Sequence, residues 1–112
     1  AEGFDPNRST VGNDRMSAWI SQPITGDLSE VPGLGPAGIA KLKDKGVTTT
    51  FNLIGEYLLL KGEGVESVEH CDKFWYWLQD TGISSHRAGI VLAIAEKMDM
   101  MFPGIYDKAP YN

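Results

Sequence analysis

The sequence predicts an all-α protein, a compact domain of five helices that contains a helix-hairpin-helix motif and has an extended tail at each end. Apolar residues recur at three- and four-residue spacing in several segments, and Gly and Pro residues separate these segments. No segment alternates apolar and polar residues convincingly, as a half-buried strand does. The helical domain is predicted over residues 13–102, between an N-terminal tail at 1–12 and a C-terminal tail at 103–112.

The motif lies in residues 31–42, VPGLGPAGIAKL, where a glycine-rich turn leads directly into a helix. Glycine suits a turn that needs φ > 0 or a close backbone approach, and Pro36 suits the first helical position. The turn is expected to present three backbone N–H groups beside a helix N-terminus, which is an arrangement that binds anions. The candidate phosphate- or DNA-binding residues are these three and the nearest cations: Gly33, Leu34, Gly35, Lys41 and Lys43.

The helices are expected at 13–20, 36–45, 51–60, 65–80 and 86–101, with one further turn at 25–30. Gly46 is expected to end the second helix, and Ser84 or Ser85 to cap the fifth. Residues at helical spacing in the last three helices are predicted to face the core: Phe51, Leu53, Ile54, Tyr57 and Leu58; Val68, Cys71, Phe74, Trp75 and Leu78; Ile90, Val91, Ile94, Met98 and Met101.

The composition is acidic. The 112 residues include 10 Lys and Arg against 15 Asp and Glu, a formal net charge of −5. Most DNA-binding domains are basic, so this balance disfavours a general affinity for polyanions. The single Cys71 permits no internal disulfide, and no apolar run approaches the length of a membrane span. A start at Ala1-Glu2-Gly3 fits removal of a targeting segment, which points to an organelle such as the chloroplast.

Contact with another protein is indicated by three features. Trp75, Tyr76 and Trp77 are consecutive and extend aromatic surface beyond one helix face. Gly55 costs a helix interior about 1 kcal/mol relative to Ala, which the close approach of a helix or subunit would offset. The tails are interpreted as slack, or as straps laid along a partner, the first with Phe4 and Val11 as anchors. The predicted protein interface is Phe4, Trp19, Gly55, Trp75, Tyr76, Trp77, Tyr106 and Tyr111.

No catalytic residue, metal site or cofactor is predicted. His70, Cys71 and Asp72 are consecutive on a helix, so their side chains point in three directions and form no nucleophile–base arrangement. Cys71 is interpreted as a small core residue, His86 as a helix-start residue and Arg87 as a solvated charge. No pair of Cys and His residues has the spacing of metal ligands.

With these elements placed, residues 15–102 resemble the barrier-to-autointegration factor family, which is built on a helix-hairpin-helix domain of the SAM-like kind. The resemblance lies in the order and spacing of five stretches and the closing helix: PITG at 23–26, GLG at 33–35, KLKDKGV at 41–47, LIGEYLLLK at 53–61 and FWYWLQDTG at 74–82. It implies a small all-α domain that forms homodimers. It also implies sequence-neutral binding of double-stranded DNA through the hairpin and nearby basic residues, and protein partners on a surface that spans the dimer.

The chain departs from the patterns of the family and of other DNA-binding hairpins in two places. Family members carry basic residues just before the first helix, where this chain has Asn13-Asp14 and then only Arg15. Other DNA-binding hairpins often place Lys where this chain has Gly38. Because DNA affinity without sequence preference depends on cations, the resemblance predicts the fold more strongly than it predicts DNA binding.

Two functions are therefore predicted. The first is a non-catalytic structural or docking subunit of a larger protein assembly, such as a photosynthetic complex, by analogy with small extrinsic subunits built on hairpin folds. The alternative is a dimeric, sequence-neutral protein that binds or bridges double-stranded DNA, which would place it in the nucleus.

Overall fold

A computed structural model describes residues 3–112, and within that range the chain is helical with no strand. The α-helices there are α1 (Asn13–Ser21), α2 (Pro36–Asp44), α3 (Thr50–Leu59), α4 (Ser67–Asp80) and α5 (Arg87–Met101). Short 3-10 turns precede, interrupt and follow them: η1 (Pro6–Arg8), η2 (Leu28–Glu30) and η3 (Ala109–Tyr111). The predicted all-α fold and its five helices are confirmed, and every helix end lies within two residues of its predicted place.

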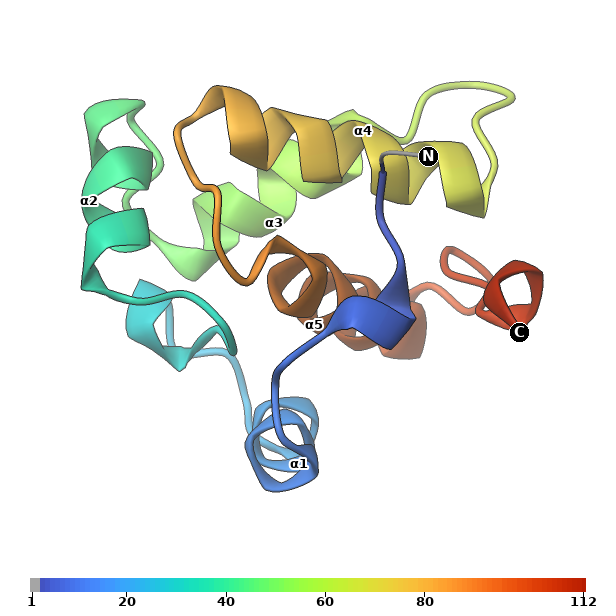
Figure 1. The fold of residues 1–112 in the computed structure, drawn as a ribbon, viewed down its shortest axis with the longest axis horizontal. Helices are drawn as coiled ribbons and strands as arrows, with labels where there is room; N and C mark the ends of the chain where they lie inside the picture. Colours follow the sequence, from blue (N-terminus) through green and yellow to red (C-terminus); the bar gives the residue numbers. More distant parts are fainter. Residues whose placement is uncertain (1–2) are drawn as a thin grey trace.

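Helix α5 lies at the centre of the molecule (Figure 1), between α4 on one side and α1 on the other. Seven of its residues are buried: Gly89, Ile90, Val91, Ala93, Ile94, Ala95 and Met98. A helix that is buried around most of its circumference belongs to the core rather than to the surface. Helix α2 and the hairpin lie at one end of the molecule, away from the chain termini (Figure 1).

Local signals in the sequence set the ends of several helices. Gly46 has φ +83°, its N–H bonds the carbonyl of Lys43, and the next N–H, of Val47, bonds the carbonyl of Leu42. This Schellman arrangement ends α2 where the sequence predicts. The hydroxyl of Thr49 accepts a hydrogen bond from the N–H of Asn52 and caps α3.

Polar residues occupy two inward positions where the sequence suggests apolar ones. Thr50 and His70 are fully buried, whereas Phe51 and Val68, predicted to face the core, are 58% and 39% exposed. Once Thr50 faces inward, the inward row of α3 continues with Leu53, Ile54 and Tyr57, and Phe51 must face solvent. His70 sets the inward row of α4 in the same way.

The predicted burial of Met101 is also wrong, as is the predicted cap of α5. Met101 is 65% exposed and the adjacent Phe102 is 47% exposed, because the last turn of α5 runs past the helices that cover the rest of it. The N-cap of α5 is His86 at φ +60°, with no side-chain capping bond, rather than Ser84 or Ser85.

Both tails fold back onto their own chain. Phe4 is buried, its ring meets the ring of Tyr111 edge-on with centroids 5.4 Å apart, and its N–H donates to Asp72 Oδ1 at 2.8 Å. Val11 lies against Gly89, where an added Cβ would come within 2.5 Å of a Val11 methyl group. Phe4 and Val11 therefore hold the N-terminal tail to its own chain, whereas the strap interpretation placed them on a partner.

Candidate functional site

The hairpin connects η2 to α2 through a turn that needs glycine. Gly33 has φ +86°, and a Cβ at this position would lie 3.2 Å from the carbonyl oxygen of His86. The hairpin thus packs against the backbone at the start of α5, and any larger residue at Gly33 would be strained. The N–H of Leu34 donates to the carbonyl of Val31 at 3.2 Å, which closes the turn.

A groove of about 230 Å³ separates the hairpin from the loop between α4 and α5. Its walls are residues 33–38 and 82–86, together with Lys41. Gly35 and His86, the N-cap residues of α2 and α5, both lie in these walls, and neither helix has a side-chain capping bond. The first N–H groups of a helix have no acceptor inside it, so two such helix starts open onto one groove.

The groove brings together four of the five predicted phosphate-binding residues, Gly33, Leu34, Gly35 and Lys41. Leu34 differs from the prediction because its N–H is bonded to Val31 and its side chain is buried, so its part in the site is packing. The backbone N–H groups of Gly33 and Gly35 have no backbone acceptor among the described residues. They remain the donors that the turn offers.

Lys41 and Lys43 lie on different sides of α2. The stem of Lys41 lies across Gly82 on the far wall of the groove. Positions two apart on a helix point about 200° apart, so Lys43 faces away from the groove. Its charge acts on Asp27, whose pKa is lowered chiefly by hydrogen bonds from Ser29 and in small part by Lys43.

Two cations outside the predicted phosphate-binding set, Arg8 and Arg87, line a hollow beside this groove rather than the groove itself. This hollow of about 320 Å³ is lined by Arg8, Thr10, His86 and Arg87 among others, and it shares Ser84 and His86 with the groove. His86 Nδ1 lies 2.9 Å from Thr10 Oγ1, so the N-terminal tail forms part of this wall. Only the fold of the tail brings Arg8 here, and no local pattern in the sequence signals it.

Arg87 is held in a fixed position beside the hollow. Its guanidinium carbon lies 3.5 Å above the centre of a Trp75 ring, and one Nη atom donates to the Trp75 carbonyl at 3.3 Å. A guanidinium group that stacks on an indole loses little freedom when it meets an anion. The predicted solvated charge is therefore a partly buried, oriented one.

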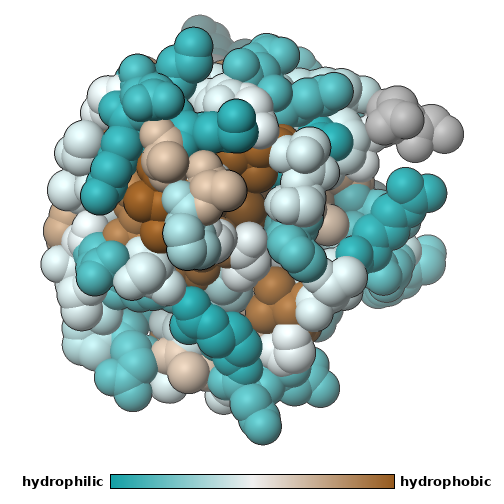
Figure 2. All heavy atoms as spheres, turned by 60° about the vertical axis from the view of Figure 1, so that its left-hand side comes forward, coloured by the Kyte–Doolittle hydropathy of each residue, from teal (hydrophilic) through white to brown (hydrophobic). Residues whose placement is uncertain are grey.

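On the face of the molecule that carries α2, hydrophobic surface is visible near the centre of the view and hydrophilic side chains surround it (Figure 2).

The predicted protein interface is largely used by the chain's own fold. Phe4, Trp19, Trp75 and Tyr106 are buried in the single chain. Trp77 and Tyr111 are half-buried, and Tyr76 is 41% exposed. Gly55 is half-buried, and an added Cβ would meet no heavy atom within 4 Å. The surface that remains for a partner is the outer side of α3 and α4.

The geometry gives no support for nucleophilic chemistry at Cys71. The thiol is fully buried, and burial, followed by the charge of Asp72, raises its pKa to about 12. A thiol that stays protonated and enclosed is inert. The adjacent His70 is buried too, with Nε2 2.6 Å from the carbonyl oxygen of Tyr57.

Residues 3–112 contain neither a clustered metal-ligand set nor a membrane-spanning helix. No group of three or more His, Cys, Asp and Glu side chains is arranged to hold a metal ion there. No helix in the same part of the chain has the length and apolar character needed to cross a membrane.

A model of the family described as "Barrier to autointegration factor" matches residues 12–99. The matched range begins beside the N-cap of α1 and ends near the last turn of α5, so it includes the hairpin and both walls of the groove. Neither the curated proteins nor the solved structures contain a match to the chain.

Proposed function

The chain belongs to the barrier-to-autointegration factor family, and on this premise we propose that it is a non-catalytic protein whose hairpin groove binds backbone phosphates of double-stranded DNA. Members of the family bind DNA and form dimers. The observation that carries the proposal is the convergence of two helix starts without side-chain caps, those of α2 and α5, on one groove beside Lys41. Helix N-termini and a nearby cation together favour phosphate oxygens.

The site is small, and this sets how strongly it can bind. Arg8, Lys41 and Arg87 border the groove and the hollow beside it, where the carboxylate of Asp5 also lies, and the whole chain has a formal net charge of −5. Acidic surface elsewhere restricts DNA to this corner of the molecule. Contact with two or three phosphates per chain gives a slope of roughly −2 to −3 when the logarithm of affinity is plotted against the logarithm of salt concentration.

Substitution of Lys41 tests the groove directly. We expect Lys41→Gln to weaken binding of a fluorescent DNA duplex about 3- to 10-fold at low salt and to reduce the salt slope by about 1. Fluorescence polarisation at two or more salt concentrations measures both quantities. Lys73→Gln is the matched control, because Lys73 is an exposed lysine on α4 that takes no part in the groove.

Absence of DNA binding by the wild-type chain at low salt would end the DNA proposal. If Lys41→Gln and Lys73→Gln lower the DNA affinity equally, the chain binds DNA but the groove is not the binding site.

A dimer through α3 is the second part of the proposal. Phe51, Gly55 and Leu59 follow one another at four-residue spacing, and Phe51 and Leu59 are 58% and 78% exposed. Among the described residues no heavy atom packs within 4 Å of the place of a Gly55 Cβ, so no close contact there requires a glycine within one protomer. A second copy of the chain that packs closely against Gly55 would offset the cost of the glycine. It would also bury the exposed side chains of Phe51 and Leu59.

Gly55→Ala separates these effects. We expect it to raise the free energy of unfolding of the monomer by up to about 1 kcal/mol, because alanine favours the helix. The added methyl group is expected to weaken the dimer about 10-fold or more, since it would hold the two helices apart. Analytical ultracentrifugation across a dilution series measures the dissociation constant of the dimer, and urea denaturation measures the free energy of unfolding of the monomer. A stable dimer that tolerates the alanine unchanged would place the interface elsewhere.

A structural or docking subunit of a larger assembly is the second candidate function. The observation that favours it is the apolar and aromatic surface left exposed on α3 and α4, where Leu59 and Tyr76 face solvent. This candidate gains support if the chain fails to bind DNA at low salt and copurifies in its source with a defined set of subunits.

A further inference from the structure

A second groove lies on the outer side of α4, and it has no residue in common with the hairpin groove. Its volume is about 810 Å³. The apolar part of its surface comes from Leu60, Val68, Tyr76 and Trp77. Val68 and Tyr76 lie eight residues apart on one row of α4, and Trp77 lies on the adjacent row. The result is an apolar strip along the helix that Asp72 interrupts between Val68 and Tyr76.

The aromatic side chains of this groove are held in place from beneath. The ring of Trp77 stacks on the buried ring of Phe74, with centroids 5.8 Å apart and planes 11° apart. Tyr76 meets the ring of Trp75 edge-on at 5.0 Å. A partner would therefore meet surfaces that need little ordering, which lowers the entropic cost of binding.

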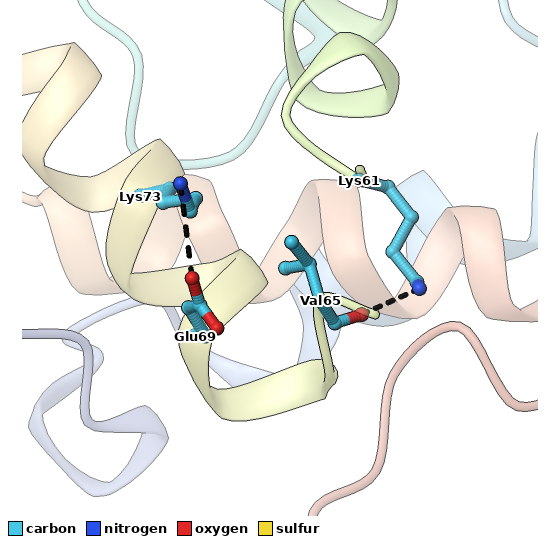
Figure 3. Close-up of polar contacts among 4 residues, drawn as sticks. All are labelled: Lys61, Val65, Glu69 and Lys73. Atoms are coloured by element: carbon cyan, nitrogen blue, oxygen red, sulfur yellow. Dashed lines mark hydrogen bonds and ion pairs between the residues drawn. The ribbon is translucent and has the colours of Figure 1, made fainter. Parts of the chain in front are cut away.

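The rim of the groove is acidic. Four carboxylates line it, Glu66, Glu69, Asp72 and Asp80, against the single amine of Lys73. Lys73 forms an ion pair with Glu69 at 3.8 Å (Figure 3).

Lys61, the other nearby cation, is directed elsewhere. Its Nζ donates to the carbonyl of Val65 and closes the loop before α4 (Figure 3). The excess of carboxylates at the groove therefore persists.

We propose that this groove docks a cationic amphipathic helix of another protein. Apolar side chains with carboxylates beside and between them fit a helix with leucine-like residues at i, i+3, i+4 and i+7 and Lys or Arg next to these. The stretch from Val68 to Asp80 is about 18 Å long, which matches roughly three turns of partner helix.

Other occupants are disfavoured by charge. A second copy docked through the same face would bring four carboxylates against four. Nucleic acids and anionic membranes are repelled for the same reason.

The probe for this proposal is a labelled 14-residue peptide of leucine and lysine with that spacing, used with the full chain. We expect binding that weakens with salt, measured by fluorescence anisotropy. A peptide with glutamate in place of lysine, and one with serine in place of leucine, should each bind at least 10-fold more weakly.

Two double variants locate the site. Val68→Ser combined with Tyr76→Ser should lower the affinity for the peptide at least 10-fold, because the apolar strip is lost. Glu69→Gln with Asp80→Asn should lower the affinity about 5-fold at low salt and flatten the salt dependence. The matched control is Asp14→Asn with Asp44→Asn, which removes two exposed carboxylates outside the groove and should change affinity less than 2-fold.

Thermal denaturation of each variant verifies folding, and all four groove positions in these variants are exposed, so their substitution leaves the core unchanged. Equal weakening by the groove and control charge variants would overturn the proposal, because the peptide would then follow net charge alone. Equal binding of the serine peptide would overturn it as well. So would loss of self-association in the Val68 and Tyr76 variant, which would make the groove an interface between two copies.

Discussion

Replacing Trp19 with alanine is expected to lower the free energy of unfolding by about 3–5 kcal/mol, because the indole fills the space between α1 and α5. Trp19 is the one fully enclosed side chain of α1, and its indole Nε1 donates to the carbonyl of Ala93 on α5 at 2.8 Å. The Nζ of Lys97 lies 5.1 Å from the ring centre and also donates to the Trp19 carbonyl. Alanine would leave a large cavity between the two helices.

Urea denaturation followed by circular dichroism measures this loss. Trp19→Phe is the matched variant, because it keeps an aromatic ring but removes the hydrogen bond to Ala93, and it should lose clearly less than the alanine variant. A loss under about 1 kcal/mol for Trp19→Ala would mean that α1 is held to α5 by other contacts.

The second large effect concerns Glu30, which joins three segments of the chain. Its carboxylate accepts hydrogen bonds from the Thr50 hydroxyl at 2.6 Å, from the N–H of Gly26 at 2.9 Å and from the N–H of Thr25 at 2.9 Å. Burial acts to raise the pKa of Glu30, but these hydrogen bonds together outweigh it and lower the pKa below its ordinary value. Thr50 is buried, and among the described residues the Glu30 carboxylate is the only hydrogen-bond acceptor that its hydroxyl reaches.

The lowered pKa fixes the direction of the pH dependence. The ionised carboxylate stabilises the folded chain at every pH above its unfolded pKa, near 4.5, and this stabilisation is lost as pH falls through the lower, folded pKa. Glu30→Gln is therefore expected to cost about 1–3 kcal/mol at pH 7 and to flatten the fall in stability below about pH 4.5.

Denaturation midpoints between about pH 3 and pH 7 test this expectation. Glu63→Gln, a change at an exposed loop position, is the control and should leave the profile unaltered. A Glu30→Gln profile parallel to the wild-type profile would show that the acid-sensitive group lies elsewhere.

The helices were predictable because their signals are local. Gly46 ends α2 through its own positive φ, and Pro36 begins α2 where the motif places it. Gly38, which stands where other hairpins carry Lys, lies against Leu34: a Cβ there would lie 2.8 Å from Leu34 Cδ1, so the end of the leucine side chain would have to move. That contact becomes visible only when the side chains are placed.

The remaining features depend on contacts between distant residues. Thr50 faces inward because Glu30, twenty positions earlier, bonds it, so hydrophobic spacing alone pointed to Phe51. Arg8 reaches the hollow next to the hairpin groove because the N-terminal tail folds over α5. Neither the burial of a polar residue nor the path of a tail can be predicted from a short segment of sequence.

The contact between Phe4 and Tyr111 has a mechanical consequence. Asn7 Nδ2 also donates to the Tyr111 carbonyl at 3.2 Å, so Phe4 and Asn7 are fastened to Tyr111, and Phe4 to α4 as well. Tension applied between Phe4 and Tyr111 would first load these contacts, including the one to Asp72 on α4, and the other helices would bear force only after the aromatic rings had parted. A flexible linker that joins the two ends would therefore span a short gap, and the resulting ring could be reopened within another loop with its helices unchanged.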